Sequence, residues 1–370
     1  MVAFAYPDDG QHVHDLERYV RAVEVVELDQ PVMGTHSRLY WQLNGWRRAL
    51  LDPNPLRGQF ADNGRMKASV DRLMKQQSFD IVQIHQAYLA SLLPVGPHAS
   101  ILDLHDVLSD YEQRLMLGTT KPTHRLQAWA EWKKMQALER RVVPRFDACT
   151  TVSEHDRASL LALTHHPRVE VVPNGVDTEY FQPTRLPEAA RLIYSGSMSF
   201  PPNSDAVRWF HSAIWPSICR QIPNACLDVV GIAPPQDILA MGQDPGVTVT
   251  GYVEDVRPYF QRAAVAVVPL RLGSGTRLKI LDAWAMGKAV VSTSVGAEGL
   301  AAVHGQNILI ADTPDDFARC VVQLLGDSAL QQRLGSAGRQ TVEAQYSWAA
   351  ISCRMDALYG TLQSSLKEGH

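Results

Sequence analysis

The sequence predicts an α/β protein made of two doubly wound domains, each a parallel sheet covered by helices. Short apolar runs rich in β-branched residues alternate with helix-like stretches along almost all of the 370 residues. The runs are nearly continuous in hydrophobicity, which is typical of strands buried on both faces. The chain is also long enough for two domains, each with its own core.

The individual strands are expected at twelve such runs, with helices between them as right-handed crossovers. In the first half they are VAFAY (2–6), VEVVEL (23–28), DIVQIH (80–85), SILDLH (100–105), ACTTVS (148–153) and VEVVPN (169–174). In the second half they are RLIYSG (191–196), CLDVVG (226–231), VTVTGYV (247–253), VAVVPL (265–270), AVVST (289–293) and NILIAD (307–312). Helical sequence without a further strand follows, from about 328 to 366.

The boundary between the domains is expected near residues 175–190, where Asn174-Gly175, Pro183 and Pro187 cluster. We therefore predict an N-terminal domain at 1–180, a C-terminal domain at 181–345, and a final helix at 346–370 that crosses back to the first domain. The first domain begins directly with a strand, without the strand, glycine-rich turn and helix that normally open such a domain. Either the true start lies upstream of Met1, or this first unit is missing.

Composition narrows the classes of function. The net charge of -4 gives no reason to expect a nucleic-acid partner. No apolar run reaches the 18 residues of a membrane span, and no basic segment precedes an apolar one at the start, as a signal peptide requires. The five cysteines are scattered without metal-type spacing, so we expect reduced core thiols in a cytoplasmic protein. Neither a metal nor another cofactor is expected.

The most informative stretch is 265–300, where a strand runs into Gly273-Ser274-Gly275-Thr276 and a helix follows from about Arg277 to Met286. Glycines let the backbone approach an anion, and the first N–H groups of a helix form a phosphate site with the helix dipole. Lys279 in the first turn is unfavourable for the helix alone, and a bound diphosphate would offset it. Asp282, on the same side, can accept hydrogen bonds from a ribose diol. The alternative is a plain strand-turn-helix capped by Ser274 and Thr276.

Five segments together carry a resemblance to family 4 retaining glycosyltransferases of the GT-B fold, which place two Rossmann-like domains face to face across a cleft. The segments are GSGTRLKILDAWAMGKAVVSTSVGAEGL, VSEHDR (152–157), VVPNGVDTEYFQP (171–183), YSGSMSFPPNSDAVRWF (194–210) and GYVEDVRPYF (251–260). They cover about 145 to 350 well, and the chain before 145 resembles the family more loosely. The resemblance implies that the first domain serves the acceptor and the second binds a nucleotide sugar.

The resemblance also implies roles for particular residues. Gly275, Thr276 and Lys279, helped by Gly273 and Arg277, would hold the diphosphate, and Asp282 the ribose. The base would lie against Gly231 and the Tyr252-Val253-Glu254 segment. Ser197 and Asn203 are expected on the loop after the second domain's first strand, facing the diphosphate. Two departures stand out: Ser274 and Asp282 occupy the positions of the family's paired glutamates, and Ser197 and Pro202 those of an arginine and a lysine.

His105 is the candidate residue of the N-terminal domain, because it follows a predicted strand where ligands of doubly wound sheets bind. The family has a histidine at a similar place near the donor sugar, so we count His105 with Lys279 and Asp282 as catalytic candidates. A surface histidine followed by Asp106 as a helix cap is an equal alternative. His85 is a second candidate of the same kind.

Residues 121–145 carry seven basic residues with Trp129 and Trp132 among them. A helix resting on an anionic membrane, where lipid-linked acceptors reside, is one interpretation. A packed helix with its tryptophans in the core and a solvated basic face is the interpretation that we favour, because interfacial helices need a cleaner apolar face.

The predicted activity is transfer of a sugar from a nucleotide-diphosphate sugar to an acceptor hydroxyl with retention of configuration, in surface polysaccharide or glycolipid synthesis. The acceptor is an unidentified sugar or lipid-linked sugar. Two alternatives stay open: a truncated or degenerate nucleotide-sugar-binding protein without turnover, and a nucleotide-sugar epimerase of the same fold. A dinucleotide-dependent oxidoreductase is disfavoured, because no G-x-G-x-x-G follows a predicted strand.

Overall fold

A computed structural model describes residues 1–5, 13, 16–27, 52–56, 63–119, 121–183, 190–273 and 277–368. The chain divides into two compact units. Unit 1 comprises 1–151, 156–171 and 357–370, and unit 2 comprises 152–155 and 172–356. Each unit contains a parallel sheet, as the alternating pattern predicts, and each of the twelve predicted runs contains a strand.

Unit 1 is built on a four-stranded parallel sheet with the order β3-β4-β5-β6. Its strands are β3 (Ile81–His85), β4 (Ala99–Leu104), β5 (Ala148–Thr151) and β6 (Val169–Val171). The helices are α4 (Asn63–Gln76), η2 (Ala87–Leu92), α5 (Leu108–Gly118), α6 (Pro122–Val142), η3 (Val143–Arg145) and α7 (Glu154–Leu163). A separate parallel pair joins β1 (Val2–Ala5) to β2 (Glu24–Glu27).

Two apolar clusters fix the sheet of unit 1. One gathers leucines and valines of the sheet with residues from α4, η2 and α6, for example Leu102, Leu104 and Val142. The other packs Leu358 and Leu362 of α16 (Trp348–Glu368) against Ala99 and Ile101. The sheet is therefore covered on both faces, which is what its continuous apolar strands require.

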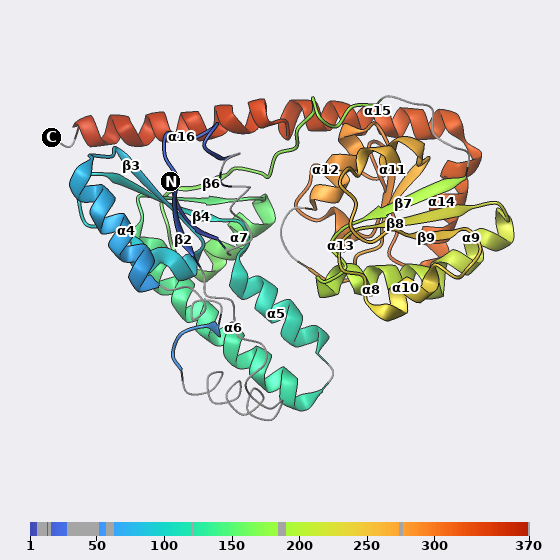
Figure 1. The fold of residues 1–370 in the computed structure, drawn as a ribbon, viewed down its shortest axis with the longest axis horizontal. Coiled ribbons are helices and arrows are strands. Elements are labelled where there is room, and N and C mark those ends of the chain that lie inside the picture. The colour runs from blue at the N-terminus through green and yellow to red at the C-terminus, as the bar shows by residue number, and fades with distance from the viewer. Residues whose placement is uncertain are drawn as a thin grey trace. The chain divides into compact units, whose positions relative to one another are not determined.

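Unit 2 is a six-stranded parallel sheet with the order β12-β11-β10-β7-β8-β9. Its strands are β7 (Arg191–Ser195), β8 (Cys226–Val230), β9 (Val247–Val249), β10 (Val265–Val268), β11 (Ala289–Ser292) and β12 (Leu309–Ile310). The helices are α8 (Pro201–Trp209), η4 (Phe210–Ile214), α9 (Trp215–Gln221), α10 (Gln236–Met241), α11 (Arg257–Arg262), α12 (Leu278–Ala285), α13 (Ser294–Ala297), α14 (Pro314–Gly326) and α15 (Ser328–Gln345). They lie on both faces of the sheet (Figure 1).

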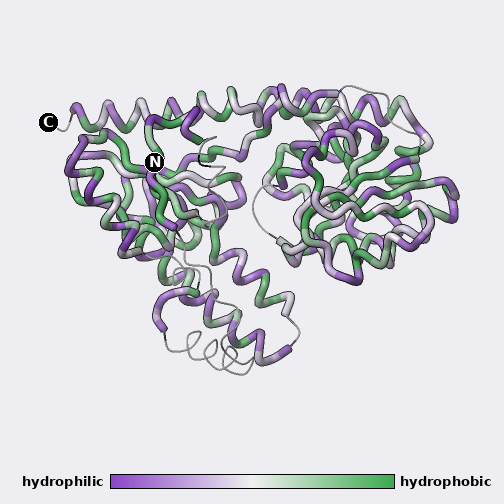
Figure 2. The backbone as a smooth tube through the Cα atoms, viewed as in Figure 1, coloured by the Kyte–Doolittle hydropathy of each residue, from purple (hydrophilic) through white to green (hydrophobic). Residues whose placement is uncertain are grey.

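The strands of unit 2 are mainly apolar (Figure 2), with Tyr194, Asp228 and Ser292 as buried polar exceptions. All four residues of β10 and all four of β11 are buried. Helix α12 ends as predicted at a glycine: Gly287 has a φ of +66°, a left-handed conformation that favours glycine. Trp284 of α12 is fully buried and donates from its indole nitrogen to the Asn307 carbonyl at 2.9 Å.

Two expectations need correction. All five cysteines are free, but Cys353 is exposed and so is not a core thiol. On α6, Trp129 is 46% exposed and Trp132 is partly buried beneath Lys133, so the expectation that both tryptophans lie in the core is wrong for Trp129. Ala130, Met135 and Val142 form the buried face of the helix instead. Within the described part of the chain, no helix has the length and apolar character to cross a membrane.

Candidate functional site

The candidate site of unit 2 lies where the direction of strand succession changes. From β7 the chain proceeds to β8 and β9 on one side, and then returns to add β10, β11 and β12 on the other. In such sheets the loops after the two central strands diverge, which leaves room for a ligand at their carboxyl ends. The loop after β7, residues 196–200, and the turn before α12 both start at this edge.

Two glycines bring the backbones of this edge unusually close together. Gly196 follows β7 and Gly231 follows β8, and both have φ values in the region that favours glycine, +152° and +154°. A Cβ atom on Gly231 would lie 1.8 Å from the Gly196 carbonyl oxygen. A Cβ atom on Gly196 would lie 2.8 Å from the Lys279 Nζ atom. Side chains at either position would therefore displace the loop or the lysine.

Lys279, in the first turn of α12, extends across the sheet edge to the loop after β7. Its Nζ atom donates to the Asn203 Oδ1 atom at 2.7 Å and to the Tyr194 hydroxyl at 3.0 Å. It also lies 4.4 Å from the centre of the Tyr194 ring. Asn203 is itself held, because its Nδ2 atom donates to the Ser197 carbonyl at 2.8 Å. The lysine head is thus fixed in one position by Asn203 and Tyr194.

A second cation accompanies Lys279. Arg277 precedes α12 and is only 9% exposed. Its charge influences both Lys279 and Tyr194. Gly273 lies close to it, since a Cβ atom on Gly273 would lie 3.0 Å from an Arg277 guanidinium nitrogen. Two cations close to the start of a helix give this edge a strongly positive character.

The protein environment disfavours charge on both Lys279 and Asp282. Burial, with a smaller effect of the Arg277 charge, lowers the pKa of Lys279 to about 7, although Asp282 opposes the change. Burial raises the pKa of Asp282 to about 7 against the opposing charge of Lys279. Both side chains still have some contact with solvent. A polyanion at this edge would restore the charged form of the lysine.

An ion pair connects two further segments at this edge, the loop after β10 and helix α8. Arg271, in the loop after β10, donates to the Asp205 carboxylate of α8 with a closest distance of 2.6 Å. Its guanidinium also lies 5.3 Å from the centre of the Trp209 ring. The loop after β10 and the first turns of α8 are therefore held at a fixed spacing.

The structure brings some of the predicted donor residues together and separates others. Lys279, Asn203 and Ser197 form one hydrogen-bonded group, and Gly231 contacts Gly196 beside it. Asn203 is on the first turn of α8 and not on the preceding loop as expected. Tyr252 is 72% exposed, and Val253 is partly buried next to it. The predicted phosphate-binding residues Ser274, Gly275 and Thr276 lie outside the described residues.

Sequence reasoning missed Tyr194. It is fully buried within β7, and burial raises the pKa of its hydroxyl. Its hydroxyl group donates to the Asn203 Oδ1 atom at 3.0 Å and accepts from Lys279. A signal was present, since a tyrosine in an otherwise aliphatic buried strand must find a partner for its hydroxyl.

The corresponding edge of unit 1 carries a cluster of His85, Asp103 and His105. His85 ends β3, Asp103 is the fifth residue of β4, and His105 directly follows β4. The His85 Nδ1 atom lies 3.0 Å from the His105 Nε2 atom and 3.1 Å from the Asp103 Oδ2 atom. The two candidate histidines are therefore neighbours, and Asp103 is the residue that sequence reasoning missed.

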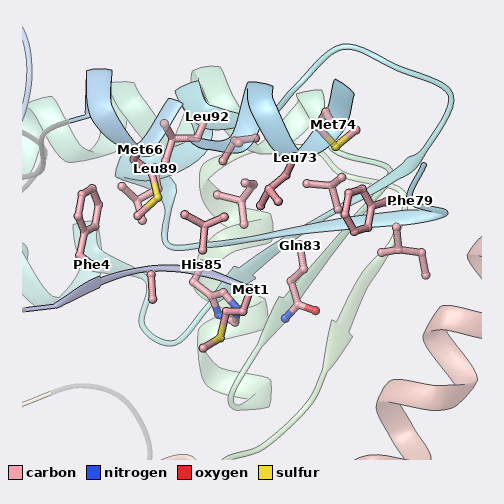
Figure 3. A pocket seen from close by; sticks show the side chains of 16 residues that line it. Met1, Phe4, Met66, Leu73, Met74, Phe79, Gln83, His85, Leu89 and Leu92 are labelled. Carbon is pink, nitrogen blue, oxygen red and sulfur yellow. The ribbon is translucent and has the colours of Figure 1, made fainter. Parts of the chain in front are cut away.

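Asp106 does not cap the following helix as the alternative interpretation of this segment expected. The N-cap residue of α5 is Val107 instead, and its side chain makes no capping hydrogen bond. His105 is 50% exposed and His85 56% exposed, so both rings are open to solvent. An apolar cavity of about 370 Å³ is lined by β1, β3, α4 and η2, and its lining includes Gln83 and His85 (Figure 3).

The fold is similar to that of solved GT-B glycosyltransferases. Sucrose-phosphate synthase from Thermosynechococcus elongatus has a similar structure, with a TM-score of 0.69 and 17% identity over 92% of this chain and 84% of that chain. HepE from Anabaena in complex with UDP has a TM-score of 0.68 and 13% identity over 97% of this chain and 92% of that chain. The chain has the GT-B fold.

The family follows from the sequence comparisons. Residues 10–180 match the model "Glycosyltransferase Family 4", and residues 189–327 match the model "Glycosyl transferases group 1". Together these matches, each of which covers less than half of the chain, support a glycosyltransferase of family 4.

Two relatives are mannosyltransferases. The GDP-mannose-dependent alpha-(1-6)-phosphatidylinositol monomannoside mannosyltransferase of Mycobacterium tuberculosis is 26% identical over 254 residues, which cover 61% of this chain and 65% of that protein. The MMP alpha-(1->4)-mannosyltransferase of Mycolicibacterium hassiacum is 24% identical over 298 residues, 77% of this chain and 71% of that protein. The aligned part of the chain thus spans just under two thirds of the M. tuberculosis relative.

Proposed function

We propose that this protein transfers a sugar from a nucleotide-diphosphate sugar to an acceptor hydroxyl with retention of anomeric configuration. The observation that carries the proposal is the fixed Lys279 head at the edge of the unit 2 sheet, held by Asn203 and Tyr194 beside two glycines. A buried lysine whose pKa is lowered to about 7 is costly for the fold, so its retention points to an anionic ligand.

In this proposal the diphosphate of the donor contacts Lys279 and Arg277, together with the backbone of Gly275 and Thr276. Asp282 accepts hydrogen bonds from the ribose hydroxyls, and the base lies toward Gly231 and Tyr252. Cations and backbone donors aimed at a departing diphosphate stabilise the charge that develops on it. The hydrogen bonds of Lys279 to Asn203 and Tyr194 support this proposal, because a lysine held in one position needs less reorganisation during the reaction.

The chemistry needs no dedicated nucleophile. The sugar–phosphate bond breaks, an oxocarbenium-like species forms, and the acceptor hydroxyl attacks from the same face and gives its proton to the leaving phosphate. The protein positions the partners and stabilises charge. His105 of unit 1 is the proposed catalytic residue of the acceptor side. We propose that transfer requires no metal ion.

For the acceptor we propose a sugar or lipid-linked sugar of glycolipid or surface polysaccharide synthesis. The relatives support this, since one acts on a phosphatidylinositol monomannoside and another is a lipopolysaccharide core glycosyltransferase of Rhizobium meliloti. The exposed Trp129 on the basic helix α6 supports peripheral contact with an anionic membrane on the cytoplasmic side. The candidate donors to be tested should include GDP-mannose, which the name of the M. tuberculosis relative gives, and UDP-glucose, which is bound in a solved structure of HepE.

A thermal-shift panel of nucleoside diphosphates and nucleotide sugars tests the donor site, because a ligand that binds only the native state raises stability. We expect the wild type to be stabilised by at least one nucleoside diphosphate. Lys279→Ala should abolish that shift and lower turnover by roughly 10²–10³-fold, as for loss of one preorganised donor. Full activity of the variant would show that the donor assignment is wrong.

Lys288→Ala is the matched control. Lys288 is another buried lysine of unit 2, but it precedes β11 at the opposite edge of the sheet, where its Nζ atom donates to the Gln261 carbonyl at 2.9 Å. It should lower stability while keeping the ligand-induced shift. Ligand binding without transfer to any acceptor would favour a binding protein, and conversion of the nucleotide sugar without acceptor would favour an epimerase.

A further inference from the structure

The cluster at the edge of the unit 1 sheet has the geometry of a metal site. Strand pairing sets His85 directly opposite Asp103 in the parallel register of β3 and β4. Asp103 and His105 are two residues apart, and alternation along a strand puts such residues on the same face. The backbone therefore directs two imidazoles and one carboxylate to the same point, without a flexible loop between them.

Three ligand atoms converge there. The His85 Nδ1, His105 Nε2 and Asp103 Oδ2 atoms form a triangle with edges of 3.0, 3.1 and 3.7 Å. A point equidistant from all three is about 1.9 Å from each, just short of the 2.0–2.1 Å of zinc–nitrogen bonds. A zinc ion slightly above the plane of the triangle would reach all three atoms with almost no movement of the side chains.

The three atoms are held by hydrogen bonds and ion pairs, in which an imidazole proton lies between a ring nitrogen and its acceptor. A cation would replace those protons and accept a lone pair from each of the three atoms. Two imidazoles with one carboxylate are also a donor set that suits zinc and similar transition ions, and magnesium much less. The half-exposed histidines leave a further coordination position open to water.

The carboxylate is supported from behind, as metal-binding carboxylates generally are. The Asp103 Oδ1 atom accepts from the Thr150 hydroxyl at 2.8 Å, and its Oδ2 atom accepts from the Gln83 amide at 2.9 Å. The Tyr359 hydroxyl donates to the Gln83 Oε1 atom at 2.7 Å, which fixes the orientation of that amide. Gln83 and His85 lie on the same face of β3, and Met66, Leu73 and Leu89 on the other (Figure 3).

We propose that His85, Asp103 and His105 bind one divalent transition-metal ion of the zinc type, with water in the remaining position. The ion would occupy the lone pair of His105 that faces the cluster. Zinc would therefore act as an inhibitor of any reaction that uses His105, and would not be a cofactor of it.

Calorimetric titration of the full chain with ZnCl₂, in the absence of donor and acceptor, tests the site independently of the transfer reaction. The wild type should bind one equivalent in a saturable manner, and CoCl₂ should give visible absorption bands typical of low-symmetry nitrogen–oxygen coordination. His85→Ala, His105→Ala and Asp103→Asn should each weaken zinc binding by more than about tenfold, and Thr150→Val by about tenfold.

His211→Ala is the matched control. His211 pairs with Asp244 at 2.6 Å in unit 2, a single histidine–carboxylate pair without a second histidine, and its loss should leave zinc binding unchanged. Because His85 and His105 are half-exposed, their alanine variants should unfold at the wild-type temperature, which separates metal loss from misfolding. The proposal is overturned if the wild type binds no zinc, or if all three ligand variants bind as well as the wild type, as adventitious binding at His165 and His166 would give.

Discussion

The two units carry polar clusters at the same place, the carboxyl edge of a parallel sheet, but the clusters differ in charge and burial. In unit 2, Lys279 is held by the neutral partners Asn203 and Tyr194, and Arg277 is buried. In unit 1, a carboxylate lies between two half-exposed imidazoles. The same edge thus supports an anion site in one unit and a cation site in the other, depending on which side chains the strand ends carry.

Burial determines how much each cluster destabilises the folded state. The lysine of unit 2 is desolvated and so destabilises the fold until an anion arrives, whereas the histidines of unit 1 remain hydrated and cost little. Substitutions in unit 2 should therefore change stability and ligand binding together, and those in unit 1 should change ligand binding alone. The predictions below test the unit 2 side of that contrast, and the zinc titrations of the His85, Asp103 and His105 variants test the unit 1 side.

The largest effect on folding is expected for Gly231→Ala. A methyl group would meet the Gly196 carbonyl oxygen at 1.8 Å, and the positive φ adds strain. We expect a loss of about 3 kcal/mol in the free energy of unfolding, from the combined costs of overpacking and strain. Urea denaturation measures it, and nucleoside diphosphate binding should weaken at the same time.

Gly305→Ala separates the two costs, because Gly305 also has a positive φ, +75°, but no atom lies within 4 Å of the added methyl group. This variant should lose only about 1 kcal/mol, the cost of the left-handed backbone. Equal losses for the two variants would show that the close approach of Gly196 and Gly231 is not what makes this edge rigid.

The second prediction concerns pH. Because the pKa of Lys279 is lowered to about 7 from 10.5, the unfolded chain binds more protons than the native protein between these values, and this residue makes stability rise with pH in that window. The pKa of Asp282 is raised from 3.8 to about 7, so this residue makes stability fall as pH rises from about 4 to 7. The pair should therefore oppose folding most strongly near pH 7.

A bound diphosphate reverses the effect on the lysine by favouring its charged form. Binding above pH 7 should take up a proton, and affinity should fall by up to about tenfold per pH unit. Calorimetry in two buffers of different ionisation enthalpy measures the uptake. If uptake persists in Lys279→Ala, another group is responsible and the assignment of the anion contact to Lys279 fails.

Most of the fold could be predicted from the sequence, because each buried strand is a short apolar run that no helix period explains. The start of α12 and the position of Lys279 also followed from local sequence, since a glycine-containing turn and a helix determine them. The partners of Lys279 did not. Asn203 and Tyr194 come from α8 and β7, and their proximity depends on β7 pairing with β10 across the switch point.

The unit 1 cluster shows the same limit in a milder form. Each histidine could be located at the end of a strand, but their contact requires the register of β3 against β4, which no pattern within either segment specifies. Asp103 was missed because it lies inside an apolar run, where one carboxylate does not by itself indicate a site. The polar residue within a buried strand was the informative signal in both units, as Asp103 and Tyr194 show.

The smallest predicted effect is that of Tyr194→Phe. It removes the hydroxyl that accepts from Lys279 at 3.0 Å and keeps the ring beneath the lysine. Loss of one hydrogen bond of about 1 kcal/mol should weaken nucleoside diphosphate binding roughly fivefold, because the lysine head is held less firmly. Tyr346→Phe is the control, since the Tyr346 hydroxyl does not contact Lys279. It accepts a hydrogen bond of 2.8 Å from the Ala301 backbone N–H. That variant should lose stability but no affinity. If both variants bind alike, the lysine does not depend on its neighbours for position, and the contrast between a preorganised unit 2 and an open unit 1 loses its basis.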